Sequence, residues 1–455
     1  MHRRARWLAL VTGLAAVSLL AAACGSDDQE SSGAPTTDRA PTAEPTATSV
    51  AEPQEAPAPD PEAGNEEEEQ EQEENGDGSS EAPSQSGGSL DTADPVRIGI
   101  LFSNSGAAGV FGPPVANIAE MIEMDINAAG GINGRSVETF LADDATDPEV
   151  GRQAMEQLLD SDSVDVVLGT HSSATREAAR PLAEAAGVPY IYAALYEGGE
   201  CSPVMFNTGE VPSQQLKPAI PWMMEETGGA KWFLLGNDYV WPRRSFELAR
   251  EYIEAAGGEV VGEEYVPLGT QDFSSVAQRI AGAGADLIFP ALVGGDAVAF
   301  ETQAVDFGIG QEALPRLANI YEENVLGAMG PAVTAGMRVT LGYFKEIDNP
   351  ANAEFVARYT ELFGADAAPH STFSSHIYDA ALLYAAAANE AGTVGAGAVI
   401  TAMAGQSLST PTGDIAVTAS RHLAQPIYIA EIGPDGSQTI VQEFAAVEPD
   451  ETCEL

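Results

Sequence analysis

The segment "VRIGILFSNSGAAGVFGPPVANIAEMIEMDINAAGG" (residues 96–131) decides the fold class. It opens on a short apolar run, passes through a glycine-rich turn, and continues with apolar residues at helical spacing until two glycines end the pattern. A strand, a turn and a helix in this order form the first half of a βαβ unit. The segment therefore predicts a parallel sheet that is covered by helices.

The same alternation continues along the chain, and helices of this length between strands require right-handed crossovers. Further strands are expected at residues 137–144, 164–170, 189–195, 231–238, 259–268 and 285–293, with helices at residues 148–160, 172–186, 245–257 and 273–283. The series pauses at residues 205–220, with about four strand–helix units on either side. This division predicts an α/β protein with two doubly wound parallel-sheet lobes.

The segments after residue 344 are expected to cross back between the lobes and to form a multi-strand hinge. They hold a long helical pattern (residues 374–392) and two strand-like runs (residues 413–419 and 426–433). The predicted body spans residues 96–447, followed by a tail at residues 448–455. Lobe 1 takes about residues 96–212 and 345–412, and lobe 2 takes about residues 213–344 and 413–447.

The N-terminus has the anatomy of an export signal. Arg3, Arg4 and Arg6 precede an apolar run that ends in small residues at Cys24. The segment "LAAAC" (residues 20–24) resembles a bacterial lipobox, which predicts a signal peptide over residues 1–24 and a lipid on Cys24. We expect the mature protein outside the cytoplasm, anchored to the cell membrane. A secreted protein cut nearby and a twin-arginine signal are the alternatives.

Residues 25–95 are rich in Ser, Pro, Ala and Glu and hold twenty acids and one base. Such a segment buries too little apolar surface to fold, so it is predicted to be a disordered tether. Its acid run (residues 66–74) could instead bind a cationic partner. The formal net charge of the whole chain is −49, which excludes nucleic acid as a partner.

No motif in the chain points to a cofactor, a metal or catalysis. The glycines at positions 106, 109 and 112 are not spaced as a dinucleotide fingerprint, although Asp143 or Asp144 stands where a ribose-reading acid would. The five histidines are scattered, and neither a nucleophile elbow nor a metal-ligand spacing occurs. We therefore predict no enzyme activity, with a hydrolase of unrecognised type as the alternative. Cys201 and Cys453 are predicted to form a disulfide.

Ligands of open α/β sheets bind beyond the carboxyl ends of the strands. The predicted strand ends lie at residues 103–111, 143–144, 170–175, 192–198, 237–243, 293–296 and 319–322. In "GTHSSATRE" (residues 169–177) the serines stand at a helix start, where they cap the helix or hold a ligand oxygen together with free backbone N–H groups. In "GNDYVWPR" (residues 236–243) the two aromatic rings are expected to point the same way from an extended segment. The candidate ligand-binding residues are His171, Ser172, Ser173, Tyr192, Tyr239, Trp241 and Tyr321.

The body resembles the type I periplasmic binding proteins of the leucine/isoleucine/valine class, which share a motif similar to "INAAGGINGRSVE" (residues 126–138). Within that class it looks closest to the receptors for urea and short-chain amides. The blocks that carry this likeness are "YEGGECSP" (residues 196–203), "TGEVPSQQLKP" (residues 208–218), "GNDYVWPR" (residues 236–243) and "YVPLGTQDFSSV" (residues 265–276). The resemblance implies a substrate-binding component of an ABC importer, with a small-molecule ligand and a membrane permease as partners.

The resemblance also implies roles for single residues. Ser173 would contact the ligand amide, and Tyr192, Tyr239 and Trp241 would wall a small pocket, with Tyr321 near another loop of that pocket. The chain departs from the family at Thr170-His171, where relatives carry Cys followed by Tyr or Trp, and at residues 193–195, where they often carry prolines. A small polar nitrogen compound is therefore expected as the ligand, either a short-chain amide or urea. A branched-chain amino acid and a regulatory, ligand-sensing role in amide metabolism are the alternatives.

Overall fold

The computed structural model describes residues 90–455. The predicted signal peptide, Cys24 and most of the predicted tether lie outside the described residues. The tether boundary at residue 95 is wrong, because strand β1 already begins at Asp91. The amide of Asp91 donates to the carbonyl of Gly134 at 2.8 Å, and the Arg135 side chain donates to the carbonyl of Asp94 at 2.7 Å. These backbone partners extend the first strand beyond its apolar run.

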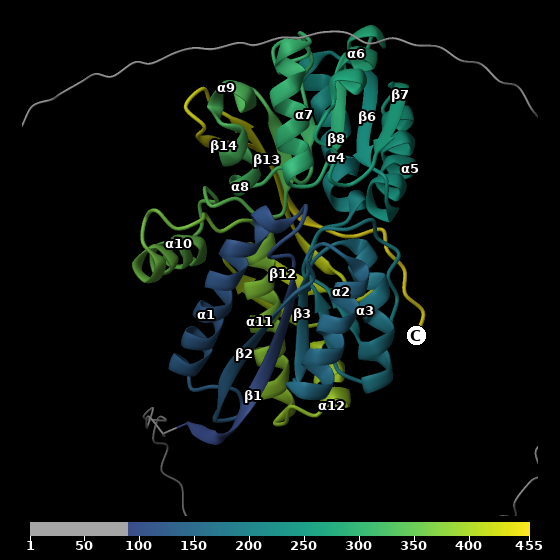
Figure 1. The fold of residues 1–455 in the computed structure, drawn as a ribbon. Coiled ribbons are helices and arrows are strands. Elements are labelled where there is room, and N and C mark those ends of the chain that lie inside the picture. The colour runs from purple at the N-terminus through teal and green to yellow at the C-terminus, as the bar shows by residue number, and fades with distance from the viewer. Residues whose placement is uncertain (1–89) are drawn as a thin grey trace, which may run out of the picture. The chain divides into compact units, whose positions relative to one another are not determined.

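Lobe 1 is built on a parallel sheet with the strand order β2-β1-β3-β4-β5 (Figure 1). The strands are β1 (Asp91–Phe102), β2 (Arg135–Asp143), β3 (Val166–Thr170), β4 (Tyr190–Tyr192) and β5 (Met205–Asn207). Its helices are α1 (Gly112–Ala128), α2 (Pro148–Glu156), α3 (Ser173–Ala186), α10 (Pro350–Phe363), α11 (Thr372–Ala391) and α12 (Ala396–Met403), with short turns η1 (Gly109–Phe111) and η2 (Gln157–Ser161). Strands β3, β4 and β5 are buried throughout, as expected for a parallel sheet between helices.

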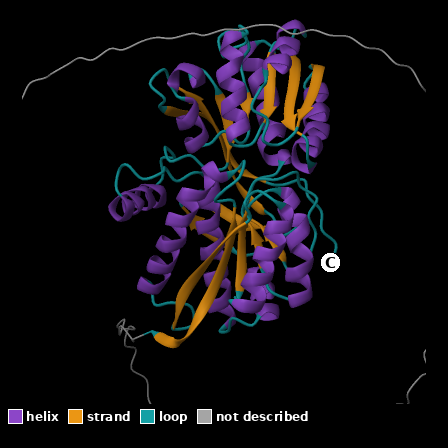
Figure 2. Ribbon diagram, viewed as in Figure 1, coloured by secondary structure: helices purple, strands orange, loops and turns teal. Residues whose placement is uncertain are grey.

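Lobe 2 holds the parallel sheet β7-β6-β8, which a bridge between Ile288 and Arg316 joins to a second set of strands. The strands are β6 (Lys231–Asn237), β7 (Glu259–Val266), β8 (Leu287–Ala291), β9 (Leu317–Ala318), β10 (Arg338–Leu341), β13 (Leu423–Ile432) and β14 (Gln438–Val447). The helices are α4 (Pro212–Thr227), α5 (Val240–Ala255), α6 (Ser274–Gly282), α7 (Gly295–Asp306), α8 (Glu323–Met329) and α9 (Pro331–Thr334). Strands β13 and β14 add an antiparallel edge (Figure 2).

Strand β13 carries the chain from lobe 1 into lobe 2. Its first residues pair with β12 (Gly413–Val417), which forms a hairpin with β11 (Ser407–Thr410), and its later residues pair with β10. The hairpin is tied to helix α11 of lobe 1, because the Thr412 hydroxyl donates to Asp379 at 2.5 Å. The crossing expected at residue 413 therefore falls later, within β13.

Residues 448–455 form neither helix nor strand, but they are held at both lobes. The amide of Asp450 donates to the Ser213 hydroxyl of α4 at 3.1 Å, and the Asp450 carboxylate pairs with Lys217 at 2.5 Å. Glu451 accepts the amide of Gly199 at 2.6 Å, and Cys453 is disulfide-bonded to Cys201. We call residues 448–453 the strap, because this segment runs from the last strand of lobe 2 to a loop of lobe 1.

Among residues 90–455, no helix combines the length and the apolar character that a membrane crossing needs. Within the same residues, no group of three or more His, Cys, Asp or Glu side chains is placed to hold a metal ion.

Candidate functional site

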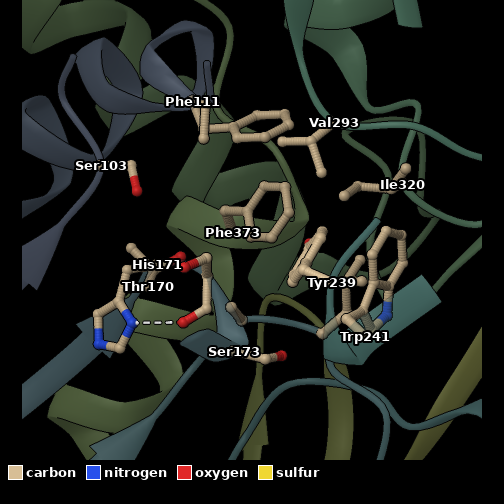
Figure 3. Close-up of a pocket in the computed structure, with 14 residues that line it drawn as sticks. Ser103, Phe111, Thr170, His171, Ser173, Tyr239, Trp241, Val293, Ile320 and Phe373 are labelled. Atoms are coloured by element: carbon tan, nitrogen blue, oxygen red, sulfur yellow. Dashed lines mark hydrogen bonds between the residues drawn. The ribbon is translucent and has the colours of Figure 1, made fainter. Parts of the chain in front are cut away.

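Both lobes line a small cavity of about 40 Å³. Lobe 1 contributes Ser103, Ala108, Phe111, Thr170, His171, Ser172, Ser173, Ala194, Leu195 and Phe373, and lobe 2 contributes Tyr239, Trp241, Val293 and Ile320. In Figure 3 the rings of Phe111 and Phe373 face Val293, Ile320, Tyr239 and Trp241 across this space. All of these residues except Phe373 lie at or just beyond the carboxyl end of a strand, so the cavity lies where an open α/β sheet binds its ligands. We call this space the cleft.

The polar end of the cleft is the start of helix α3. The hydroxyl of Ser172 accepts the amide of Thr175 at 3.1 Å, and the Ser172 carbonyl accepts the amide of Arg176 at 3.0 Å. Ser172 is therefore the cap of this helix. The first N–H groups of a helix have no partner within it. The two bonds to Ser172 leave the amides of Ser173 and Ala174 as donors at the polar end, within the part of the chain that the structure describes.

Behind Ser173 lies a buried ionic cluster. The Ser173 hydroxyl donates to Glu197 Oε2 at 2.5 Å, and Arg176 Nη2 donates to Glu197 Oε1 at 2.6 Å. Arg176 Nε also pairs with Glu200 at 3.0 Å. Ser173, Arg176 and Glu197 are 2%, 3% and 5% exposed, so this network stays out of bulk water. The cluster fixes the Ser173 side chain at the edge of the cleft.

His171 presents a neutral ring. Its Nε2 lies 2.6 Å from the hydroxyl of Tyr190, and its Nδ1 lies 3.1 Å from the Ser172 carbonyl. Burial lowers the pKa of His171 to about 4, so the ring carries no charge at neutral pH. Tyr192, a predicted ligand contact, does not line the cleft. Its hydroxyl donates to the His171 carbonyl at 2.5 Å and holds the backbone behind the cleft.

The lobe 2 wall is formed by Tyr239 and Trp241. Tyr239 has an extended backbone and precedes α5, but Trp241 already lies in the first turn of that helix. The expectation that one extended segment carries both residues is wrong. Pro242 follows within the same turn, where the fixed φ of proline suits a helix. The side chain of Asn237 accepts the amide of Val293 at 2.8 Å and donates to Asp296 at 2.6 Å, which ties two strand exits of the wall together.

Tyr321, another predicted contact, also lies behind the cleft. It is fully buried, and its hydroxyl lies 3.4 Å from Glu301, which pairs with Arg316 at 3.1 Å in the core of lobe 2. Its neighbour Ile320 lines the cleft instead. The structure thus brings five predicted residues to the cleft, namely His171, Ser172, Ser173, Tyr239 and Trp241, and leaves Tyr192 and Tyr321 out of it.

Sequence reasoning missed several lining residues. Ser103, Phe111, Val293 and Ile320 lie inside predicted strand-end ranges, but a lone serine or a lone apolar residue in such a range gives no signal that would single it out. Phe373 lies at the start of α11 and packs against Phe111, with ring centroids 4.5 Å apart. Two buried polar atoms of cleft residues, the Ser103 hydroxyl and the Trp241 indole N–H, have no hydrogen-bond partner among residues 90–455. Each of these can receive a polar group of a ligand.

Comparisons with known proteins agree with this architecture. The family model described as "Periplasmic binding protein" matches residues 95–437. The chain is 27% identical to the Leu/Ile/Val-binding protein homolog 6 of Brucella melitensis over 356 residues, which cover 75% of this chain and 88% of that protein.

Solved structures are similar over most of their length. A solute binding protein of an ABC transporter from Rhodopseudomonas palustris BisB5, in complex with 3,4-dihydroxy benzoic acid, is 26% identical with a TM-score of 0.70 and covers 78% of this chain and 98% of that chain. The leucine binding protein LivK from Thermotoga maritima shares the fold, with 18% identity, a TM-score of 0.68 and coverage of 77% and 99%. The chain therefore belongs to the periplasmic binding protein family, in the type I class that includes the Leu/Ile/Val-binding proteins.

Proposed function

We propose that the protein is the substrate-binding component of an ABC importer and that its cleft takes a small, neutral ligand with an apolar body and an amide head. The observation that carries this proposal is the uneven lining of the cleft. One end offers the backbone amides and the hydroxyl at the start of α3, and rings and aliphatic side chains form most of the rest, to which Ser103 and Thr170 add hydroxyls. An apolar pocket with a few convergent polar groups is typical of small-molecule sites.

The lining argues against a charged ligand. Within residues 90–455, no Lys, Arg, Asp or Glu side chain lines the cleft, and the His171 ring is neutral. A free amino acid would bring an ammonium and a carboxylate into a site without a countercharge, which is costly. Urea is polar on every side and would leave N–H groups facing Phe111 and Phe373. A short-chain amide such as isobutyramide can place its head at Ser173 and its methyl groups against the rings.

The size of the cleft also favours a compact ligand. A volume of about 40 Å³ corresponds to about three or four water molecules, which suits a ligand of a few heavy atoms. Contacts from both lobes give such a ligand a higher affinity for the closed protein than for an open one. Binding therefore shifts the population toward the closed form, which is the form presented to the membrane permease. The predicted lipid on Cys24 would keep the protein near that permease.

A second candidate ligand is a small aromatic acid. The solute binding protein from Rhodopseudomonas palustris BisB5 was solved with 3,4-dihydroxy benzoic acid and is 26% identical to this chain. Phe111, Phe373 and Trp241 would suit an aromatic ring. A benzoate exceeds the volume of the cleft, so this ligand requires the lobes to lie further apart.

A thermal-shift screen followed by calorimetry tests the proposal. The panel contains acetamide, propionamide, isobutyramide and benzamide, together with urea, benzoate, 3,4-dihydroxybenzoate, leucine and valine. A ligand at 100-fold its dissociation constant stabilises the protein by about 2.7 kcal/mol. We expect the aliphatic amides to give the largest shifts. Shifts by leucine, benzoate or urea alone would reject the amide proposal, and release of ammonia from an amide would indicate an enzyme.

A further inference from the structure

We propose that Glu197, a residue outside the cleft, determines which ligand head groups the cleft accepts. Its carboxylate accepts the hydrogen bond that the single proton of the Ser173 hydroxyl can make, so that proton is not available to a ligand. This inference rests on the proposed function and names the chemistry that separates an amide from the matching acid. Glu197 is a positioning residue, since it acts on the ligand only through Ser173.

The direction of the hydrogen bond between Ser173 and Glu197 follows from the partners of Glu197. A carboxylate has only acceptor oxygens, and the Arg176 guanidinium has only donors. Arg176 lies 2.6 Å from Glu197 Oε1, so the ionised carboxylate is the form that this ion pair stabilises. At 2.5 Å from Glu197 Oε2, the Ser173 hydroxyl is therefore the donor. A serine hydroxyl has one proton, and here that proton points away from the cleft.

The surroundings of the pair hold this arrangement in place. The Arg176 guanidinium lies over the rings of Tyr192 and Tyr196, at 5.2 Å and 4.5 Å from their centroids. The loop that carries Glu197 is secured a few residues later by the disulfide at Cys201. The Glu197 carboxylate is buried, accepts two hydrogen bonds and lies on a secured loop, so it cannot readily turn away from Ser173. The Ser173 hydroxyl therefore keeps donating to Glu197.

The cluster holds no surplus positive charge. Glu197 and Glu200 both pair with Arg176, and Arg180 lies 3.4 Å from Glu200 but pairs more closely with Glu184, at 2.7 Å. A ligand carboxylate beside Ser173 would add a negative charge to a cluster whose two arginines already face three carboxylates, although Arg176 Nη1 has no hydrogen-bond partner among residues 90–455. Burial of an unpaired charge is strongly unfavourable.

The polar end of the cleft therefore matches a primary amide. The Ser173 oxygen turns its lone pairs toward the ligand and can accept an N–H group. The backbone amides of Ser173 and Ala174 can donate to a carbonyl oxygen. A carboxylate offers only acceptors, so one of its oxygens would face the Ser173 lone pairs with Glu197 behind them. An amide satisfies both kinds of group, and an acid satisfies one.

The substitution Glu197→Gln tests this assignment at nearly constant shape. The glutamine oxygen can still accept from Arg176, and its NH₂ group can donate to Ser173, which reverses that hydrogen bond. The hydroxyl proton then becomes available to the ligand, and one negative charge is removed. Calorimetry at pH 7.5 compares two matched pairs, propionamide with propionate and isobutyramide with isobutyrate. We expect the wild type to bind each amide more tightly than its acid by about tenfold or more, and Glu197→Gln to lower that ratio by about tenfold.

The matched control is Glu200→Gln. This change also removes a negative charge beside Arg176, but Glu200 makes no bond to Ser173. We expect its amide-to-acid ratio to stay within about threefold of the wild type. Ser173→Ala provides a second route if Glu197→Gln does not fold, because loss of the acceptor should weaken the amides and spare the acids. Circular dichroism and a cooperative thermal transition establish that each variant is folded.

The outcomes separate the two proposals. If the wild type binds neither pair, the ligand class of the proposed function is wrong and this inference falls with it. If the wild type prefers the acids, or if Glu197→Gln keeps the wild-type ratio, the inference is overturned while solute binding in the cleft stands. If Glu200→Gln shifts the ratio as much as Glu197→Gln does, net charge and not the Ser173 proton sets the preference, which also overturns it.

Discussion

The rings of Tyr239 and Trp241 lie 6.2 Å apart, although one residue has an extended backbone and the other belongs to a helix. Because the backbone changes from extended to helical between Tyr239 and Trp241, the indole and the phenol ring lie in the same wall of the cleft. Since Tyr239 and Trp241 come from lobe 2 and face Phe111 and Phe373 of lobe 1, this pair supplies much of the surface that a ligand meets only when the lobes are closed.

We therefore expect Trp241→Ala to weaken the binding of isobutyramide by well over about tenfold, because a buried aromatic wall is lost. Truncation of a buried Trp also costs stability, about 3–5 kcal/mol, so Trp241→Phe is measured as well and should give an intermediate affinity. Ser245→Ala on the same helix is the control, since Ser245 is buried outside the cleft. An unchanged dissociation constant for Trp241→Ala in calorimetry would remove the indole from the site.

Neighbouring residues 320 and 321 should behave differently. Ile320→Ala is expected to weaken binding by about tenfold through the loss of apolar contact in the cleft. Tyr321→Phe removes only the long bond to Glu301, so the affinity should stay within about threefold of the wild type. Titration calorimetry of both variants with isobutyramide decides between them, and the reverse order would place Tyr321 in the site as the sequence suggested.

Asp379 should make stability depend on pH. Burial raises the pKa of Asp379 to about 6 from 3.8, so the native protein holds this proton more tightly than the unfolded chain does. The stabilisation from the bound proton is complete below about pH 3.8 and is lost as the pH rises through about 6. Asp379→Asn has no such loss. Its stability relative to the wild type should therefore rise by about 2.4 kcal/mol between pH 4 and pH 8.

Urea denaturation at both pH values measures the Asp379→Asn difference. The control is Asp366→Asn, which changes an exposed acid and should give the same difference at pH 4 and pH 8. A gap between Asp379→Asn and wild type that does not change with pH would show that the native carboxyl does not hold its proton.

The disulfide between Cys201 and Cys453 should contribute substantially to stability. It closes a loop with a sequence separation of 252 residues, for which loop entropy predicts about 5 kcal/mol. The double variant Cys201→Ser, Cys453→Ser should therefore unfold at a lower denaturant concentration. Wild type treated with a reductant should move to the same midpoint. Equal midpoints for the oxidised wild type and the double variant would mean that the disulfide adds no stability.

The sequence predicted the alternation of strands and helices and the edge of the sheets at which the cleft lies. Both follow from local rules, namely the period of the apolar residues and the carboxyl ends of parallel strands. The positions of Ser173, Tyr239 and Trp241 followed from the same rules. That these residues contact a ligand stays a prediction.

Single side chains at the strand ends were harder to predict, for a geometric reason. Successive residues of an extended segment point to opposite sides, so an error of one residue exchanges the inside for the outside. This is why Ile320 lines the cleft where Tyr321 was expected. The contact of Phe373 with Phe111 and the ion pair of Arg176 with Glu197 join segments that only tertiary packing brings together. No local sequence pattern predicts contacts of this kind.

Helix α11 has a consequence for the order in which the molecule can assemble. It packs against α1 and β3 of lobe 1 and is buried on nearly every side, yet it follows all of the helices and parallel strands of lobe 2 in the chain. A fragment that ends before residue 372 therefore holds the complete first sheet but lacks one of its covering layers. Neither lobe corresponds to one continuous stretch of chain. Lobe 1 can therefore complete its packing around β1 only after helix α11, near the end of the chain, has been made.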